Sequence, residues 1–169
     1  GLMRTGEPGV YAIGDIVNTP QLAHVASAEG ILAVEHMAGR EVRPINYDHV
    51  PSATYCEPEI AGIGLTEAKA KQRGHDVKTS KFPFTHSSKA PILGQTSGFV
   101  KMVADSKYGE LLGVHIIGPR ATEMIAEAGI ALRTEATVEE MYRTIHPHPT
   151  LSEAMMEAAR GVFDRAIHL

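Results

Sequence analysis

Cysteine is almost absent from this sequence of 169 residues, and Cys56 supplies the one thiol. A single cysteine excludes an internal disulfide framework and any metal cluster built from cysteines of this chain. The His-x-His pair at 146 and 148 offers only two ligands, and no cysteine, histidine or carboxylate set at ligand spacing completes it. We therefore expect no metal site, and any redox chemistry must take its sulfur atoms from elsewhere.

The sequence also lacks a basic stripe and a long apolar run. Its formal net charge is −4, with basic and acidic residues interspersed, which disfavours binding to nucleic acid. No run reaches the roughly 18 to 20 apolar residues that span a bilayer, and the first residues lack the apolar core of a signal peptide. We expect a cytoplasmic protein with neither a nucleic-acid nor a membrane partner.

The hydrophobic pattern predicts two parts, residues 1–45 and 46–169, separated by a proline-containing linker. In the first part, the β-favouring run at 10–15 predicts a buried strand that carries Asp15 at its end. Thr19 and Pro20 suit the N-cap and first turn of a helix that Gly39 ends. One strand and one helix make half of a βαβ unit.

The second part predicts an antiparallel sheet followed by helices. Alternation and turn residues predict strands at 53–55, 59–64, 77–84, 98–104 and 109–117. Helical spacing and capping residues predict helices at 66–74, at 121–132, after Thr137 and at 152–165. The expected fold class is α+β, an antiparallel sheet covered on one face by helices and preceded by a strand-helix remnant of an α/β domain.

Two histidines and a carboxylate lie close together at the start of the last predicted helix. His146 and His148 lie in a proline-stiffened loop, and Glu153 follows the second histidine by five residues. Histidine titrates near neutral pH, and a carboxylate bound to one ring nitrogen orients the ring, so the pair predicts acid/base chemistry. The alternative is that Thr150-x-x-Glu153 is only a capping box beside bystander histidines, and residue types alone leave both open.

A second candidate site lies at the end of the first predicted strand. Asp15 follows Gly14 there and could accept hydrogen bonds from a sugar-like hydroxyl. The segment 21–24 opens the next helix, where free backbone N–H groups and a partial positive charge face a bound group. The alternative is that Asp15 begins a turn and His24 is a surface residue of the helix.

These motifs stand in the order of a known family. The segments that carry the resemblance are Tyr11-Ala12-Ile13-Gly14-Asp15, Leu22-Ala23-His24, Glu29-Gly30, Tyr55 to Glu67, Gly113 to Pro119, and His146-x-His148-Pro149-Thr150-Leu151-Ser152-Glu153. Together they resemble the C-terminal third of the dihydrolipoyl dehydrogenase family, a branch of the class I pyridine nucleotide-disulfide oxidoreductases. The resemblance covers nearly the whole chain.

The resemblance implies a flavoprotein homodimer that oxidises protein-bound dihydrolipoamide with NAD. His148 is then the acid/base group and Glu153 its orienting carboxylate, acting on the disulfide and flavin held mainly by the other subunit. Asp15 is expected to bind the ribityl part of FAD. The residues that line the flavin are then Gln21, Leu22, Ala23 and His24. The expected partners are lipoyl-bearing subunits of 2-oxo acid dehydrogenase complexes. Residues 1–45 are then the end of the FAD-binding domain, and residues 46–169 are the dimerisation domain.

Two features of the family are missing from this sequence. It has neither a Gly-x-Gly-x-x-Gly fingerprint after a strand nor a cysteine pair for a redox disulfide. We therefore expect a fragment that is inactive alone. Two alternatives stay open: a related mercuric or glutathione-type reductase, and a non-catalytic dimerisation module.

Overall fold

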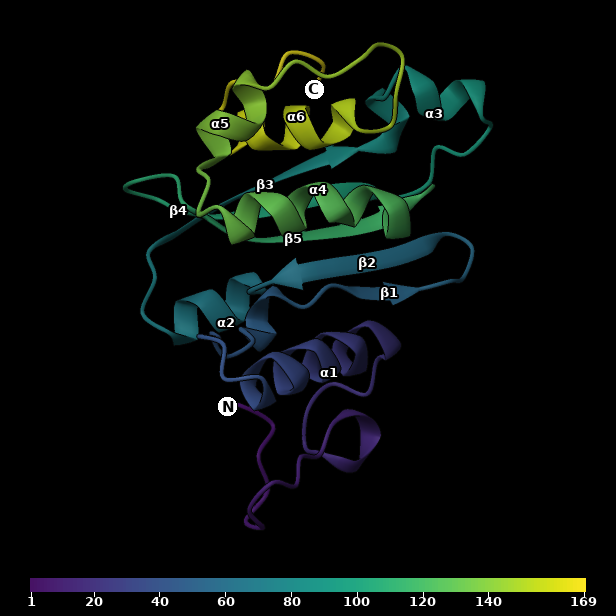
Figure 1. Ribbon diagram of the computed structural model, residues 1–169. Coiled ribbons are helices and arrows are strands. Elements are labelled where there is room, and N and C mark those ends of the chain that lie inside the picture. The colour runs from purple at the N-terminus through teal and green to yellow at the C-terminus, as the bar shows by residue number, and fades with distance from the viewer. The chain divides into compact units, whose positions relative to one another are not determined.

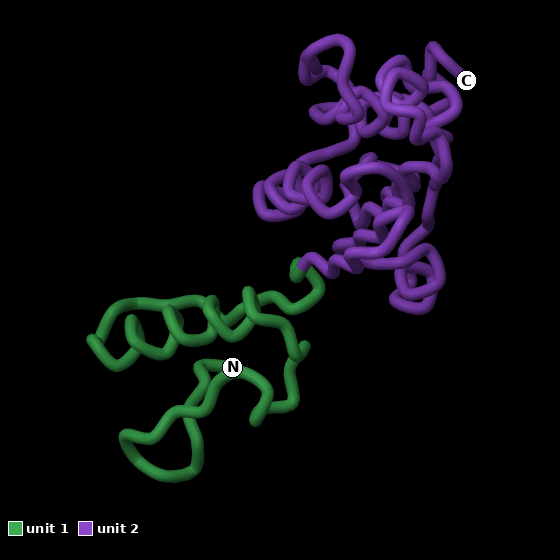
Figure 2. Tube along the Cα trace, turned by 90° about the vertical axis from the view of Figure 1, so that its right-hand side faces the viewer, with its two compact units in different colours: residues 1–50 green, residues 51–169 purple.

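The computed structural model describes residues 1–169 and separates them into two compact units, Gly1–Val50 and Pro51–Leu169. Figure 2 colours these units green and purple. The division falls after Val50, a few residues beyond the boundary that the sequence predicts at 45/46.

The first unit is built around the helix α1, Ala23–Met37. Before it lies the 3₁₀ turn η1, Gly14–Ile16, and after it the 3₁₀ turn η2, Tyr47–His49. The predicted strand at 10–15 is wrong. A β-strand forms a run of backbone hydrogen bonds with a neighbouring strand. This segment forms only a single bridge, between Arg4 and Tyr11, before the turn begins.

Helix α1 also begins later than Thr19 and Pro20 predict. The extended backbone at Leu22, with φ −135° and ψ 136°, makes this residue the N-cap, and its side chain cannot cap. The predicted end is close to the observed one: Gly39 lies just past the helix with φ 72°, the left-handed conformation that glycine adopts without a steric penalty.

The second unit contains a five-stranded antiparallel sheet in the order β1-β2-β5-β4-β3. The strands are β1 (Ser52–Thr54), β2 (Glu59–Gly64), β3 (Val77–Pro83), β4 (Phe99–Asp105) and β5 (Leu111–Gly118). The predicted strands are confirmed to within one or two residues at most ends. Asp105 accepts hydrogen bonds from the amides of Lys107 and Tyr108, which closes the turn between β4 and β5.

Helices pack on this sheet, with the two longest of them on one face, as the α+β prediction requires (Figure 1). They are α2 (Glu67–Gln72), α3 (Lys89–Ile92), α4 (Ala121–Arg133), α5 (Val138–Arg143) and α6 (Glu153–Gly161), with the 3₁₀ turn η3 at Phe84–His86. Helix α4 packs on β2 and β5, and α6 packs on β3 and β4. The last helix ends at Gly161, earlier than the predicted 165.

The main core lies between the sheet and helices α4, α5 and α6. Alternate side chains of β4, Val100 and Met102, are fully buried there, together with Met155 of α6. A smaller cluster of Leu65, Ala70, Val103 and Leu112 packs α2 against the opposite face. No helix of the protein is both long and apolar enough to cross a membrane.

Candidate active site

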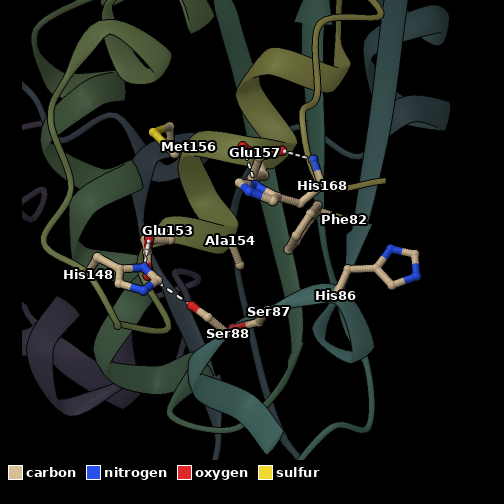
Figure 3. A pocket seen from close by; sticks show the side chains of 10 residues that line it. All are labelled: Phe82, His86, Ser87, Ser88, His148, Glu153, Ala154, Met156, Glu157 and His168. Carbon is tan, nitrogen blue, oxygen red and sulfur yellow. Dashed lines mark hydrogen bonds and ion pairs between the residues drawn. The ribbon is translucent and has the colours of Figure 1, made fainter.

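The loop between α5 and α6 brings His148 and Glu153 together. Nδ1 of His148 lies 2.8 Å from Oε1 of Glu153, the first residue of α6 (Figure 3). The imidazole is 70% exposed and the carboxylate only 20%. The hydrogen bond occupies Nδ1, so Nε2 is the ring nitrogen that can exchange a proton with a bound molecule.

The Glu153 carboxylate is itself fixed from two sides. Its Oε2 accepts a hydrogen bond of 2.8 Å from the backbone amide of Thr150 and one of 3.4 Å from Oγ of Ser88, on the segment that precedes α3. Burial raises the pKa of this carboxyl. The hydrogen bonds from Thr150 and His148 outweigh burial, so the pKa of Glu153 lies below its usual value and the group is a carboxylate at neutral pH.

The capping-box alternative is half realised in the structure. Glu153 does reach back to the amide of Thr150, as a capping box requires. The Thr150 hydroxyl, however, donates to the Pro147 carbonyl at 2.7 Å, and the N-cap of α6 is Ser152, which makes no capping hydrogen bond. Glu153 therefore combines a structural contact through Oε2 with a contact to an exposed imidazole through Oε1.

The pair opens onto a cavity of about 120 Å³ between α6, η3 and the C-terminal segment. Besides the pair, Phe82, Ser88 and Glu157 are among the residues that line it (Figure 3). Glu157 is only 2% exposed, and its Oε2 accepts hydrogen bonds from the backbone amides of Ile167 and His168 at 2.8 and 3.2 Å. Glu157 was not predicted from the sequence, although a carboxylate among the apolar positions of a helix marks it.

The other histidine of the motif, His146, makes a second pair with an acid. Its Nε2 lies 2.9 Å from Oε1 of Glu127 on α4, and its Nδ1 lies 2.9 Å from the Thr144 carbonyl oxygen. The side chain is only 5% exposed. His146 is thus a buried residue with an acidic partner, which the bystander alternative did not anticipate, and that partner was not identified from the sequence.

The second candidate site lies in the first unit. Asp15 is exposed within η1, beside Gly14, whose φ of 71° turns the chain. The residues 21–24 form the start of α1, where no side chain caps the helix. The uncapped first turn offers backbone N–H groups and the positive end of the helix dipole. Gln21, Ala23 and His24 are exposed and Leu22 is partly buried.

A fully buried carboxylate, Glu29, holds this turn in place. Its Oε2 accepts a hydrogen bond of 2.7 Å from the Gly14 amide, and its Oε1 accepts one of 2.8 Å from the Tyr47 hydroxyl. Burial and the Glu29 carboxylate raise the pKa of Tyr47 to about 12. This role of Glu29 was not predicted from the sequence, although the residue lies one turn from Val25 and Leu32 on the buried side of α1.

Comparison with known proteins identifies the family of this chain. Residues 50–159 match the family described as pyridine nucleotide-disulphide oxidoreductase, dimerisation domain. The dihydrolipoyl dehydrogenase of Bacillus subtilis is 53% identical over 98% of this chain and 35% of its own length. The one of Thermus scotoductus is 50% identical over 99% of this chain and 36% of its own length. The solved structure of LpdA from Mycobacterium tuberculosis superposes with a TM-score of 0.90 at 30% identity, covering 95% of this chain and 35% of that one.

The chain thus spans about a third of the length of the relatives that it matches. The matched segment contains the whole sheet, α4, α5 and most of α6 with Glu153. The chain belongs to the family of pyridine nucleotide-disulphide oxidoreductase dimerisation domains and is similar over nearly its whole length to dihydrolipoyl dehydrogenases.

Proposed function

We propose that this chain is the C-terminal part of an FAD-dependent dihydrolipoyl dehydrogenase and supplies its acid/base pair. The single observation that carries the proposal is the contact of 2.8 Å between His148 and Glu153 at the edge of an open cavity. The similarity to named dihydrolipoyl dehydrogenases at 50% identity and above supports the substrate class. The parent reaction converts dihydrolipoamide and NAD⁺ to lipoamide, NADH and a proton.

In this proposal His148 removes the proton of a thiol and thereby makes the sulfur nucleophilic. Its Nε2 takes the proton of one thiol of dihydrolipoamide while that sulfur attacks a disulfide that this chain does not supply. A mixed disulfide forms, the original S–S bond breaks, and its second sulfur leaves as a thiolate. The Glu153 carboxylate fixes Nδ1 as a donor and stabilises the resulting imidazolium. Because Glu153 is also held by the Thr150 amide, the ring is oriented before substrate arrives.

The first unit offers groups that fit part of an FAD site. Asp15 can accept hydrogen bonds from ribityl hydroxyls, and the uncapped start of α1 can face the electron-rich edge of the flavin. Residues 21–24 would line the ring, and Glu29 keeps the turn in position through the Gly14 amide. When bound, FAD would supply two-electron redox chemistry between the dithiol and NAD.

The same proposal assigns partners. The family description supports a homodimer formed through the second unit, so that His148 serves the disulfide and flavin of the other subunit. Lipoyl-bearing subunits of 2-oxo acid dehydrogenase complexes in the cytoplasm then present the dihydrolipoamide. These assignments rest on similarity to proteins about three times as long as this chain.

The test is His148→Gln in the complete flavoprotein, with His86→Gln as a matched control. His86 lines the same cavity but contacts no carboxylate in the structure. Loss of general acid/base catalysis lowers turnover by about 10² to 10⁴-fold, so we expect a fall of that order in dithiol oxidation for the first variant only. Unchanged turnover in His148→Gln would favour a non-catalytic dimerisation module.

A further inference from the structure

His146 faces two hydrogen-bond acceptors at once. Nδ1 lies 2.9 Å from the Thr144 carbonyl oxygen and Nε2 lies 2.9 Å from a carboxylate oxygen of Glu127. A neutral imidazole has one N–H donor and can satisfy only one of these acceptors, whereas an imidazolium donates to both. The ring is almost entirely buried, so an unmatched nitrogen would be costly.

The surroundings favour the charged form of this ring. The hydrogen bond to Glu127 raises the pKa of His146 above its ordinary value, against the effect of burial. Acidic groups from three helices lie near it: Glu127 of α4, Glu140 of α5, which lines one cavity together with His146, and the more distant Glu153 of α6. No lysine or arginine lines that cavity.

The contacts of His146 tie the start of the α5–α6 loop to two helices. Thr144 is the C-cap of α5, and Glu127 lies in the middle of α4. The far end of the loop is tied by the Thr150 amide, which donates to Glu153. His148 lies between the two anchors, two residues beyond the first.

We propose that His146, bridging Glu127 and the Thr144 carbonyl as an imidazolium, is a positioning residue that fixes the 144–152 loop and thereby holds His148 against Glu153. The role of His146 as a positioning residue rests on the acid/base role proposed above for His148. The ordering of the loop does not rest on that role, because the contacts of His146 with Glu127 and Thr144 hold the loop whether or not His148 transfers a proton.

The Thr150 amide provides a direct reporter of this order, because its proton is held by Glu153. We would measure its hydrogen exchange by NMR in the unmodified protein, in Glu127→Ala and in the control Glu123→Ala. Glu123 lies one turn earlier on α4 and has no contact with His146. The Met102 amide, deep in β4, reports unfolding of the whole unit.

We expect Glu127→Ala to speed exchange at Thr150 by about tenfold, the effect of losing one charge-assisted hydrogen bond, with little change at Met102. The control should leave both amides unchanged. Equal exchange at Thr150 in Glu127→Ala and the control would overturn the proposal, as would a parallel rise at Met102, which indicates general destabilisation.

A second measurement does not depend on any variant. The ring ¹⁵N shifts of His146 should show both nitrogens protonated at pH 7, and a neutral ring at that pH would also overturn the proposal. Failure of the proposed function looks different: dithiol oxidation survives His148→Gln while the exchange result at Thr150 remains.

Discussion

At the residue scale, three glutamates hold loops by accepting hydrogen bonds from backbone amides. Glu29 holds Gly14, Glu153 holds Thr150, and Glu157 holds Ile167 together with the following amide. Two of these side chains, Glu29 and Glu157, are almost completely buried. Burying a carboxylate is unfavourable unless such donors surround it, so each loop is arranged around its carboxylate.

Replacing Glu153 by glutamine should destabilise the second unit by about 1 to 3 kcal/mol at neutral pH, because the Thr150 and His148 contacts lose their charge. The folded-state pKa is lowered, so the contribution is present above the unfolded pKa of about 4.3 and is lost as pH falls through the folded value. Urea unfolding at pH 7 and pH 3 measures this. A stability difference of equal size at both pH values would contradict it.

Replacing Glu29 by glutamine should lower the pKa of Tyr47 from about 12 toward that of an ordinary tyrosine, about 10. The removed carboxylate no longer repels the tyrosinate that forms at high pH. Absorbance near 295 nm during alkaline titration follows the ionisation, and Tyr47→Phe identifies which step belongs to this residue. An unchanged titration in the Glu29 variant would show that the contact is not formed in solution.

At the scale of elements, sequence patterns located structure where the stabilising contacts are local. The hairpin of β4 and β5 and the helix capped by Thr66 depend on neighbours within a few residues, and both are confirmed. The strand at 10–15 failed because a strand depends on partners that local sequence does not specify. The start of α1 shifted to Leu22, although Thr19 is the better capping residue type.

The cap of α2 provides a prediction at this scale. Thr66→Ala removes the hydrogen bond of 3.2 Å that the hydroxyl accepts from the Lys69 amide, and should cost about 1 kcal/mol. Thr85→Ala, at an exposed position that caps no helix, is the control and should be neutral within about 0.5 kcal/mol. Chemical denaturation measures both changes, and equal losses would contradict a capping role for Thr66.

At the scale of the whole molecule, the site joins segments that the sequence keeps far apart. The spacing of His148 and Glu153 within one motif made that pair predictable, but Ser88 and Glu127 lie 65 and 19 residues from their partners. Only the packing of α4 and α6 on the sheet, with the segment before α3 beside them, brings these residues together. The motif therefore predicted the contact between His148 and Glu153, and could not predict which residues hold that pair in place.

The proposed homodimer makes a prediction about exposed apolar residues of the second unit. Ile145 is 94% exposed and Ile130 is 69% exposed, whereas stable dimers bury such side chains. Ile145→Asp should weaken self-association at least about tenfold, because a carboxylate would be desolvated in the interface. Sedimentation equilibrium measures this, with Ile92→Asp on α3 as control. Equal weakening in both variants, or none, would exclude Ile145 from the interface.

Flavin reduction in the complete protein tests directly whether His148 and Glu153 move the proton in dithiol oxidation, as proposed above. Rapid mixing of His148→Gln with dihydrolipoamide should reduce the flavin about 10² to 10⁴-fold more slowly than in the unmodified protein. Mixing with NADH should reduce it at nearly the same rate, because that step needs no thiol deprotonation. Flavin reduction by dihydrolipoamide at the unmodified rate would contradict the account.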